Sequence, residues 1–323
     1  MSRRREPIRG EQRAPARETL HSADRTLVVI PARYGSTRFA GKPLAVIRGV
    51  PMIVHVLRRA SRVRNADAVV VATDDPRIKA IVDDAGGTAI MTSSEHATGT
   101  SRVREAAAKF THSIVVNVQG DEPLLPVTAV ERLIDSMRAD RSLMMSTLAA
   151  PLDDLEEFAR PDVVKVVCDH DGNALYFSRS PIPYPGFSPE GAAPPRAAPL
   201  APAADAGKHL LRHIGVYAFR RELLMLWRRL APGPLERLES LEQLRALENG
   251  YRIRVVVCRT DAIGVDRPED LRKIERVLRS RPNARRSRPS TLCTTGSIAS
   301  SRMSVTTTSA PWSARPRHSA APS

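Results

Sequence analysis

The stretch VVIPARYGSTRFAGKPL at residues 28–44 joins a short apolar run to a basic loop that contains two glycines. An unbroken run of β-branched and other apolar residues is typical of a parallel strand that is covered on both faces. The glycines permit backbone conformations that other residues avoid, and Arg33, Arg38 and Lys42 add positive charge. The stretch therefore predicts a buried strand at residues 26–32, followed by a loop that binds a polyphosphate. A solvated basic turn is the alternative, because the spacing matches neither GxxxxGK[ST] nor GxGxxG.

Apolar runs of the same kind recur at residues 67–73 and 113–119, and they predict two more strands. Two segments with apolar residues at helical spacing separate the strands. The segment 51–63 begins with Pro51 at the first helical position, and the segment 75–87 ends on a pair of glycines. This alternation predicts a doubly wound α/β fold with a mostly parallel central sheet. Such sheets bind ligands beyond the carboxyl ends of their strands.

The second half of the chain is less regular. Residues 163–180 predict a hairpin whose turn is the Asp-Gly-Asn sequence at 171–173. A loop rich in proline and alanine follows at 185–208, and strand character returns at 213–219. Residues 234–250 predict one continuous helix with leucines along one face, which indicates a core or dimer contact.

The composition is that of a globular protein. The 323 residues are 42% hydrophobic, which is enough for a sizeable core. No apolar stretch approaches the roughly 18 residues that a membrane span needs, and the N-terminus lacks the apolar middle of a signal peptide. We therefore expect a cytoplasmic protein without membrane contacts. The three cysteines lack metal-ligand spacing and are expected to be reduced and structural.

The net charge of +15 is concentrated at the two ends of the chain. Residues 1–25 hold seven arginines and four acidic residues, and residues 281–323 hold seven arginines and no acidic residue. Both ends have the composition of disordered segments, and the part between them carries only +5. Aromatic residues make up 4% of the chain, so few platforms for base stacking exist. We therefore expect no nucleic-acid partner, although a nucleic-acid-binding protein acting through basic tails is the second class considered.

Several sequence blocks together resemble one enzyme family. The block IPARYGSTRFAGKPL resembles the N-terminal signature of sugar nucleotidylyltransferases, and most closely that of the 3-deoxy-manno-octulosonate (Kdo) cytidylyltransferases, IPARYxSTRLPGKPL. The departure is Phe39-Ala40 in place of Leu-Pro. The blocks VVVATDDPRI, VVNVQGDEPLLP, NALYFSRSPIP, RHIGVYAFR and GVDRPEDL resemble the family in the same order. The resemblance covers about residues 26–275.

The resemblance implies a reaction and a nucleotide site. The anomeric hydroxyl of Kdo would attack the α-phosphate of CTP in a single in-line displacement, and pyrophosphate would leave. The family's catalytic positions correspond to Arg33, Lys42 and Asp121, and Mg²⁺ would be held by Asp121 and Asp266. The nucleotide-binding positions correspond to Arg33, Ser36, Arg38, Lys42, Gly99, Thr100 and Gln119. For Thr100, an ordinary helix N-cap is an equal alternative, and both aspartates also fit turn or capping roles.

The resemblance also implies a sugar site in the second half of the chain. Arg179 would pair with the carboxylate of Kdo, because a guanidinium suits a bidentate contact. His213 and Tyr217 are four residues apart and should lie on one face of a strand. Glu239 and Gln243 are four residues apart and should share one face of the predicted helix. These four would hydrogen-bond the sugar hydroxyls.

The family implies an overall organisation as well. Residues 26–280 would form the cytidylyltransferase domain, with a smaller sugar-binding and dimerisation subdomain, and residues 1–25 and 281–323 would be disordered extensions. The family forms homodimers, and its product CMP-Kdo is used to build lipopolysaccharide. A cytidylyltransferase for another acidic sugar, such as sialic acid or amino-Kdo, is the nearest alternative.

Deletion of residues 1–25 and 281–323 distinguishes the two classes of function. We expect the shortened chain to keep its turnover of CTP, because the expected site residues all lie between the deleted segments. Pyrophosphate release is the measurement. A nucleic-acid affinity that falls steeply with salt concentration and disappears on deletion would instead assign the function to the tails.

Overall fold

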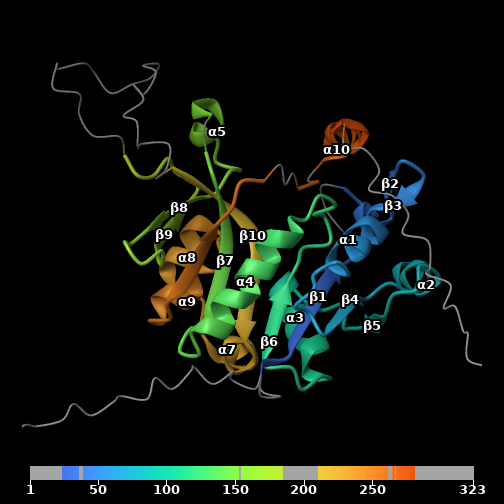
Figure 1. The fold of residues 1–323 in the computed structure, drawn as a ribbon, viewed down its shortest axis with the longest axis horizontal. Helices are drawn as coiled ribbons and strands as arrows, with labels where there is room; N and C mark the ends of the chain where they lie inside the picture. Colours follow the sequence, from blue (N-terminus) through green and yellow to red (C-terminus); the bar gives the residue numbers. More distant parts are fainter. Residues whose placement is uncertain are drawn as a thin grey trace, which may run out of the picture. The chain divides into compact units, whose positions relative to one another are not determined.

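A nine-stranded mixed sheet forms the centre of the computed structural model (Figure 1). The structure describes residues 24–35, 39–152, 154–184, 210–260, 264–265 and 267–280. The predictions for Ser36, Arg38, Asp266 and the loop 185–208 therefore lie outside the described residues, as do those for the two tails apart from Asp24 and Arg25.

The main path of the sheet has the order β11-β7-β10-β6-β1-β4-β5. These strands are β1 (Thr26–Ala32), β4 (Ala68–Thr73), β5 (Ala89–Met91), β6 (Ile114–Asn117), β7 (Met145–Pro151), β10 (Leu211–Arg220) and β11 (Ile253–Val257). Neighbouring strands run parallel except around β10, which is antiparallel to both β6 and β7. The sheet is thus mostly parallel, which agrees with the prediction.

A hairpin and a two-stranded sheet complete the strand set. The hairpin consists of β8 (Lys165–Cys168) and β9 (Ala174–Ser178), and β8 also pairs with β10. Its turn contains Gly172 at a φ of 77°, in the left-handed region that favours glycine. The hairpin predicted at 163–180 is therefore confirmed. The separate small sheet pairs β2 (Val46–Ile47) with β3 (Val50–Pro51).

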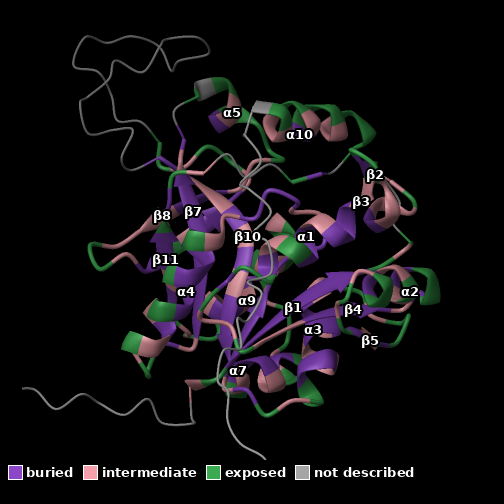
Figure 2. Ribbon diagram, turned by 45° about the vertical axis from the view of Figure 1, so that its right-hand side comes forward, coloured by how far each residue is buried: buried purple, intermediate pink, exposed green. Residues whose placement is uncertain are grey.

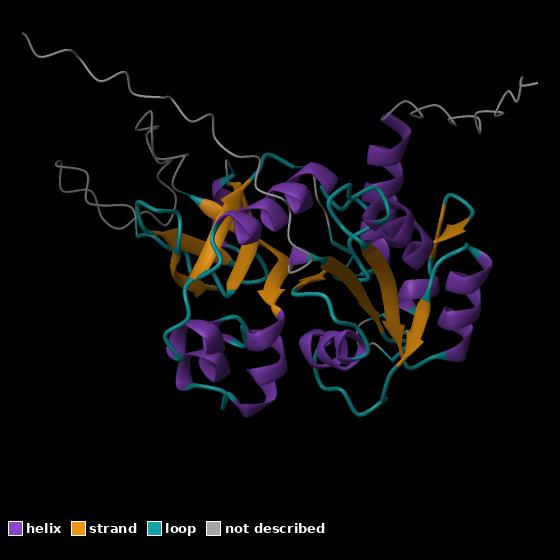
Figure 3. Cartoon of the chain, turned by 60° about the horizontal axis from the view of Figure 1, so that its bottom comes forward, coloured by secondary structure: helices purple, strands orange, loops and turns teal. Residues whose placement is uncertain are grey.

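Helices cover both faces of the sheet (Figure 3). On one face α1 (Met52–Ala60), α2 (Pro76–Asp84) and α4 (Val127–Ala139) share a core with Val28 and Ile30 of β1. On the other face α3 (Gly99–Ala108), α7 (Arg221–Leu226) and α9 (Leu244–Glu248) share a core with Leu27 and Val29. Every residue of β1 is buried, as expected for a strand between two layers (Figure 2). The remaining helices are η2 (Lys42–Leu44), α5 (Leu155–Ala159), η3 (Trp227–Arg229), α8 (Pro234–Glu239) and α10 (Pro268–Ser280).

The predicted strands of the first half are confirmed within two residues at each end, and the predicted helices begin within one residue of the observed ones and end three residues later. β1 has the predicted bounds, and the other two strands are shorter than the apolar runs that predicted them. Pro51 is the N-cap of α1 and pairs in β3, so its placement at the first helical position was wrong by one residue. Contacts group all the described residues into one unit. No described helix is long and apolar enough to cross a membrane.

The chain enters this unit before β1. Asp24 lies 3.2 Å from Arg141 and 3.5 Å from Arg220, measured between carboxylate oxygen and guanidinium nitrogen. A shortened chain that preserves these ion pairs therefore begins at residue 24 instead of residue 26.

The continuous helix predicted at 234–250 was wrong. The segment forms two short helices, α8 and α9, because Ser240 ends α8 in the left-handed region with a φ of 52°. Leu238 is 81% exposed whereas Leu241 is 6% exposed, although three residues apart on one helix would share a face. The break is accompanied by a distant contact: Arg179 Nε donates to the backbone oxygen of Glu239 at 2.8 Å. Glu239 and Gln243 consequently do not share one helix face.

Substitution of Ser240 tests whether the helix break is built into the fold. We expect Ser240→Val to lower the free energy of unfolding by about 1–2 kcal/mol, because a β-branched residue is strained in the left-handed region. Ser240→Gly should stay within about 1 kcal/mol of the wild type. Urea unfolding with linear extrapolation measures both. Equal stability of the two variants would contradict the left-handed conformation.

Candidate active site

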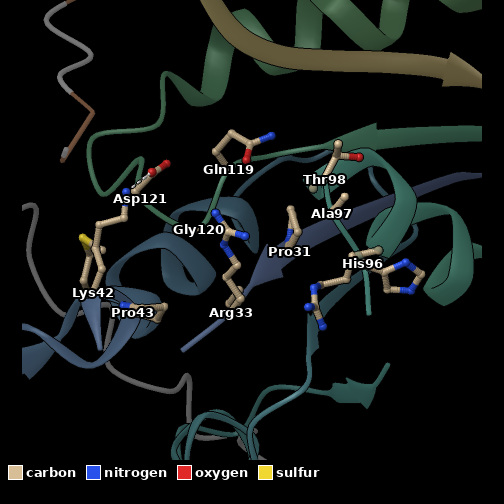
Figure 4. Close-up of a pocket in the computed structure, with 14 residues that line it drawn as sticks. Pro31, Arg33, Lys42, Pro43, His96, Ala97, Thr98, Gln119, Gly120 and Asp121 are labelled. Atoms are coloured by element: carbon tan, nitrogen blue, oxygen red, sulfur yellow. Dashed lines mark hydrogen bonds and ion pairs between the residues drawn. The ribbon is translucent and has the colours of Figure 1, made fainter. Parts of the chain in front are cut away.

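A cavity of about 230 Å³ lies beyond the carboxyl ends of β1 and β6 (Figure 4). Its wall contains Arg33, which directly follows β1, the segment 96–99 before and at the start of α3, and the segment 119–121 after β6. This is the edge of the sheet where doubly wound folds bind ligands. We call it the first cavity.

Glycine is required where the segment after β6 meets β1. A Cβ atom at Gly120 would lie 2.7 Å from the backbone oxygen of Pro31, which is closer than any side chain can approach. A Cβ atom at Gly99 would lie 3.3 Å from Oε1 of Gln119. The two glycines therefore let β1, α3 and the segment after β6 converge on the first cavity.

Lys42 and Asp121 form an ion pair in the wall of this cavity. Lys42 Nζ donates to Oδ2 of Asp121 at 2.5 Å and to the backbone oxygen of Val265 at 2.9 Å. The backbone N–H of Val265 donates in turn to the backbone oxygen of Asp121 at 3.0 Å. The ion pair is partly buried, with side-chain exposures of 15% for Lys42 and 29% for Asp121. Residues far apart in the sequence are thus joined beside the cavity.

Arg102 is a buried cation of the first cavity that the sequence analysis missed. It is 3% exposed and lines the cavity from α3. Its guanidinium donates to Oγ1 of Thr92 at 2.6 Å and to Oδ2 of Asp74 at 2.7 Å. The sequence held a signal for it, because residues 99 and 102 are three apart at the start of a helix and share a face.

The structure brings together most of the described residues expected at the nucleotide. Arg33, Lys42, Gly99, Gln119 and Asp121 all line the first cavity. Thr100 is absent from that lining. It is 5% exposed and its hydroxyl donates to Oε2 of Glu242 at 2.8 Å. The alternative that Thr100 is the N-cap was wrong, because Thr98 caps α3 with its side chain.

A second, more open cavity of about 920 Å³ adjoins the segment after β6. Asp121 lines the first cavity and the next residue, Glu122, lines the second. Gly215 lines the second cavity and a Cβ atom there would lie 3.9 Å from Cγ of Gln119. Residues 119–122 therefore separate the two cavities.

The second cavity lies beside the part of β10 where one edge of this strand stops pairing with β8 and begins to pair with β6. β10 pairs with β6 from Arg220 back to Tyr217, and with β8 at Leu211 and Arg212. Between these ladders, residues 214–216 pair with neither β6 nor β8, and a bulge interrupts the ladder to β7 in the same place. His213, Ile214, Gly215 and Tyr217 line the cavity.

Three of the five residues expected at the sugar line the second cavity: His213, Tyr217 and Gln243. The rings of His213 and Tyr217 lie 5.4 Å apart, which confirms that they share one face of the strand. Tyr217 Oη donates to Oε1 of Gln243 at 3.2 Å.

Arg179 and Glu239 do not line either cavity. The guanidinium of Arg179 donates to the backbone oxygens of Glu239 at 2.8 Å and Pro161 at 3.1 Å. The carboxylate of Glu239 accepts from Ser178 Oγ at 2.6 Å and from the backbone N–H of Arg179 at 2.9 Å. In this structure both side chains tie the end of β9 to the end of α8.

Comparison with known proteins gives a consistent family. The model of the family described as cytidylyltransferase matches residues 27–253. The 3-deoxy-manno-octulosonate cytidylyltransferase of Syntrophotalea carbinolica is 48% identical over 251 residues, which cover 78% of this chain and 97% of that protein. The chain belongs to the 3-deoxy-manno-octulosonate cytidylyltransferase family. The protein of the same name from Syntrophobacter fumaroxidans is 48% identical over 257 residues, covering 79% of this chain and 97% of that one.

A solved structure agrees with this family assignment. It is described as CMP:2-keto-3-deoxy-manno-octonic acid synthetase complexed with CTP, and it is 42% identical to this chain with a TM-score of 0.71. The alignment covers 80% of this chain and 99% of that protein. The predicted family and the predicted fold class are both confirmed. The individual site residues stay predictions, since the comparisons do not test them.

Burial keeps two side chains of the second cavity neutral in this member of the Kdo cytidylyltransferase family. It lowers the pKa of His213 to about 3. Burial, together with the negative charge of Glu242, raises the pKa of Tyr217 well above its usual range. At neutral pH both groups are therefore uncharged hydrogen-bonding groups. The cations of this cavity are Arg160, Arg212, Arg267 and Lys273.

The low pKa of His213 predicts a loss of stability in acid. In the unfolded chain the imidazole takes up a proton near pH 6.5, whereas in the folded protein it does so near pH 3. The unfolded state therefore binds more protons between these values, so the free energy of unfolding falls as the pH falls. Between pH 7 and pH 5 we expect the wild type to lose about 1–2 kcal/mol more than His213→Gln. Urea unfolding at both pH values measures this, and equal losses would contradict an imidazole that stays neutral in the folded protein.

Proposed function

We propose that the chain transfers CMP from CTP to the anomeric hydroxyl of Kdo, giving CMP-Kdo and pyrophosphate. The observation that carries this proposal is the pair of adjoining cavities on either side of residues 119–122. A donor and an acceptor bound in adjoining cavities can react directly where the cavities meet. The similar solved structure is described as a complex with CTP, and the relatives are named for transfer to this sugar.

The first cavity fits the triphosphate of a nucleotide. Arg33, Lys42 and Arg102 supply three cations, and Lys42 and Arg102 are held in place by partners at 2.5–2.9 Å. A polyphosphate carries several negative charges, so fixed cations favour its binding and the departure of pyrophosphate. We propose that Arg33 and Lys42 contact the phosphates, and that Gly99 and Gln119 border the nucleoside.

The second cavity fits an acidic sugar. His213, Tyr217 and Gln243 supply uncharged hydrogen-bonding groups for hydroxyls, and four cations line the same cavity. Three of those cations lie near acidic partners: Arg160 at 2.5 Å from Asp162, Lys273 at 3.0 Å from Asp270 and Arg212 at 3.9 Å from Glu157. The pairing of Arg179 with the sugar carboxylate stays a prediction, and it requires this guanidinium to exchange its carbonyl partners for the carboxylate.

We propose Mg²⁺ as the cofactor. Asp121 offers the hard carboxylate oxygen that this ion prefers, and Val265, which precedes position 266, is hydrogen-bonded to Asp121. Among the described residues no group of three or more histidine, cysteine or acidic side chains forms a metal site, so phosphate oxygens and water would complete the coordination. When bound, Mg²⁺ would neutralise phosphate charge and lower the pKa of the attacking hydroxyl.

The chain's own residues contribute mainly by placement. The two cavities hold the acceptor hydroxyl beside the α-phosphate, which removes most of the entropic cost of bringing two substrates together. The neutral groups of the second cavity orient the sugar, and the cations of the first hold the phosphates in line. No covalent intermediate with the protein is needed, because the hydroxyl attacks phosphorus directly.

We further propose a cytoplasmic homodimer that supplies CMP-Kdo for lipopolysaccharide. The proposed dimer rests on the family resemblance. A different acidic sugar is the second candidate, since the carboxylate is the feature that the cations recognise.

Pyrophosphate release from CTP in the presence of Mg²⁺ tests the function. We expect release that requires Kdo, is absent with sialic acid or without sugar, and ceases when Mg²⁺ is removed. Asp121→Asn should lower kcat by about 100-fold or more, because it removes the charge that holds both Lys42 and the metal. Asp83→Asn is the matched control, since Asp83 pairs with Lys79 on the exposed face of α2.

Each other outcome has a definite meaning. Release that requires sialic acid would make sialic acid the acceptor sugar and leave the proposed mechanism unchanged. Release without any sugar would show hydrolysis in place of transfer. Full activity of Asp121→Asn would show that the carboxylate of Asp121 is not needed for the reaction.

A further inference from the structure

We propose that Thr147 is a positioning residue that holds His213 in the tautomer with its proton on Nε2, so that Nδ1 accepts a hydrogen bond from a hydroxyl of the acceptor sugar. This inference rests on the proposed function and deepens it, because it states the polarity of one contact in the second cavity. The sequence analysis did not single out Thr147.

Thr147 lies where β7 faces the bulge of β10. Its side chain is fully buried, and the ladder between the strands shifts register from Ile214 to Tyr217 opposite it. Thr147 Oγ1 lies 2.9 Å from His213 Nε2 and 2.9 Å from the backbone oxygen of Val216. The backbone oxygen of Ile214 is farther away, at 3.4 Å.

The hydroxyl has one proton, and its position is determined by these contacts. Two oxygens 2.9 Å apart attract each other only when a proton lies between them, and a carbonyl oxygen has none to give. The hydroxyl of Thr147 must therefore donate to Val216. Toward His213 the Thr147 oxygen can then only accept a hydrogen bond. Nε2 must therefore carry a proton and donate a hydrogen bond to Thr147.

The surroundings of the ring keep it neutral. Phe177 packs edge-on against the ring of His213, with 5.1 Å between the ring centroids. The ring of Tyr217 is tilted against it, with 5.4 Å between the centroids. Burial among these rings lowers the pKa of His213. A neutral imidazole has one proton, and when Nε2 carries it, Nδ1 has a lone pair and can only accept.

Because Nε2 is bonded to Thr147, the lone pair of Nδ1 is the group through which His213 can hydrogen-bond a ligand. His213 lines the second cavity, and within the described part of the chain Nδ1 has no hydrogen-bond partner. A sugar hydroxyl can donate to it, whereas a carboxylate or an ether oxygen cannot. The contact therefore selects for a hydroxyl and against an oxygen that lacks a proton.

The tautomer can be read directly by ¹⁵N NMR of histidine-labelled, ligand-free protein at pH 7. We expect protonated Nε2 and unprotonated Nδ1 for His213 in the wild type and in Thr147→Ser, which keeps the hydroxyl. In Thr147→Val, which replaces the hydroxyl by a methyl group of similar size, we expect protonation of Nδ1 to appear. His213→Gln assigns the resonances.

Steady-state kinetics gives the second readout. We expect Thr147→Val to raise the KM for Kdo about tenfold, as expected for the loss of one hydrogen bond, while the KM for CTP stays unchanged and Thr147→Ser restores the KM for Kdo. Ser146→Ala is the matched control, because Ser146 is the buried neighbour on β7 and its hydroxyl has no partner among the described residues. It should leave both constants unchanged. Thermal unfolding shows whether each variant is folded, and Thr147→Ala replaces Thr147→Val if that variant is not.

The two readouts separate the possible failures. Protonated Nδ1 in the wild type, or an unchanged tautomer in Thr147→Val, would overturn the role of Thr147. A changed tautomer with an unchanged KM for Kdo would overturn the contact with the sugar. Absence of turnover with any acidic sugar would overturn the proposed function, whereas the ligand-free spectra would still decide what Thr147 does to the ring.

Discussion

The contact between Gly120 and the end of β1 is the constraint on which both cavities depend. Because nothing larger than glycine fits beside the backbone oxygen of Pro31, the segment after β6 lies directly against β1. Gln119 and Asp121 are thereby fixed on either side of Gly120 and face the first cavity, and Glu122 faces the second. A side chain at position 120 would separate the segment from β1 and displace all three residues at once.

Buried positive charge occurs both beside the first cavity and outside the two cavities. Arg102 is held by Asp74 and Thr92 beside the first cavity. Lys165, in β8, is fully buried, and its Nζ donates to the backbone oxygens of Arg160, Val163 and Arg179. Burial lowers the pKa of Lys165, and the carbonyl dipoles compensate part of the lost hydration. Arg102, which lines the first cavity, is fixed before any substrate binds, so it needs little reorganisation when an anion arrives.

The sequence predicted those features that depend on local patterns. The bounds of β1, the hairpin turn at Gly172 and the shared face of His213 and Tyr217 follow from periodicity and turn chemistry, and the structure has all three. The break at Ser240 could not be predicted in this way, because it is accompanied by a contact with Arg179, 61 residues earlier in the chain. The orientation of Thr100 toward Glu242 also depends on a distant residue, which lies in the turn between α8 and α9. Family resemblance identified the positions, but only the packing shows which side chains face a cavity.

The change of partner along β10 has a consequence for how the second cavity can respond to a ligand. The cavity is lined by β10 and also by the segment 160–164 and by α10. The wall formed by β10 is held by backbone hydrogen bonds on either side of residues 214–216, which are among the least deformable contacts in a protein. An acceptor therefore meets a preformed surface at β10, and this wall discriminates between sugars by their fit to its shape.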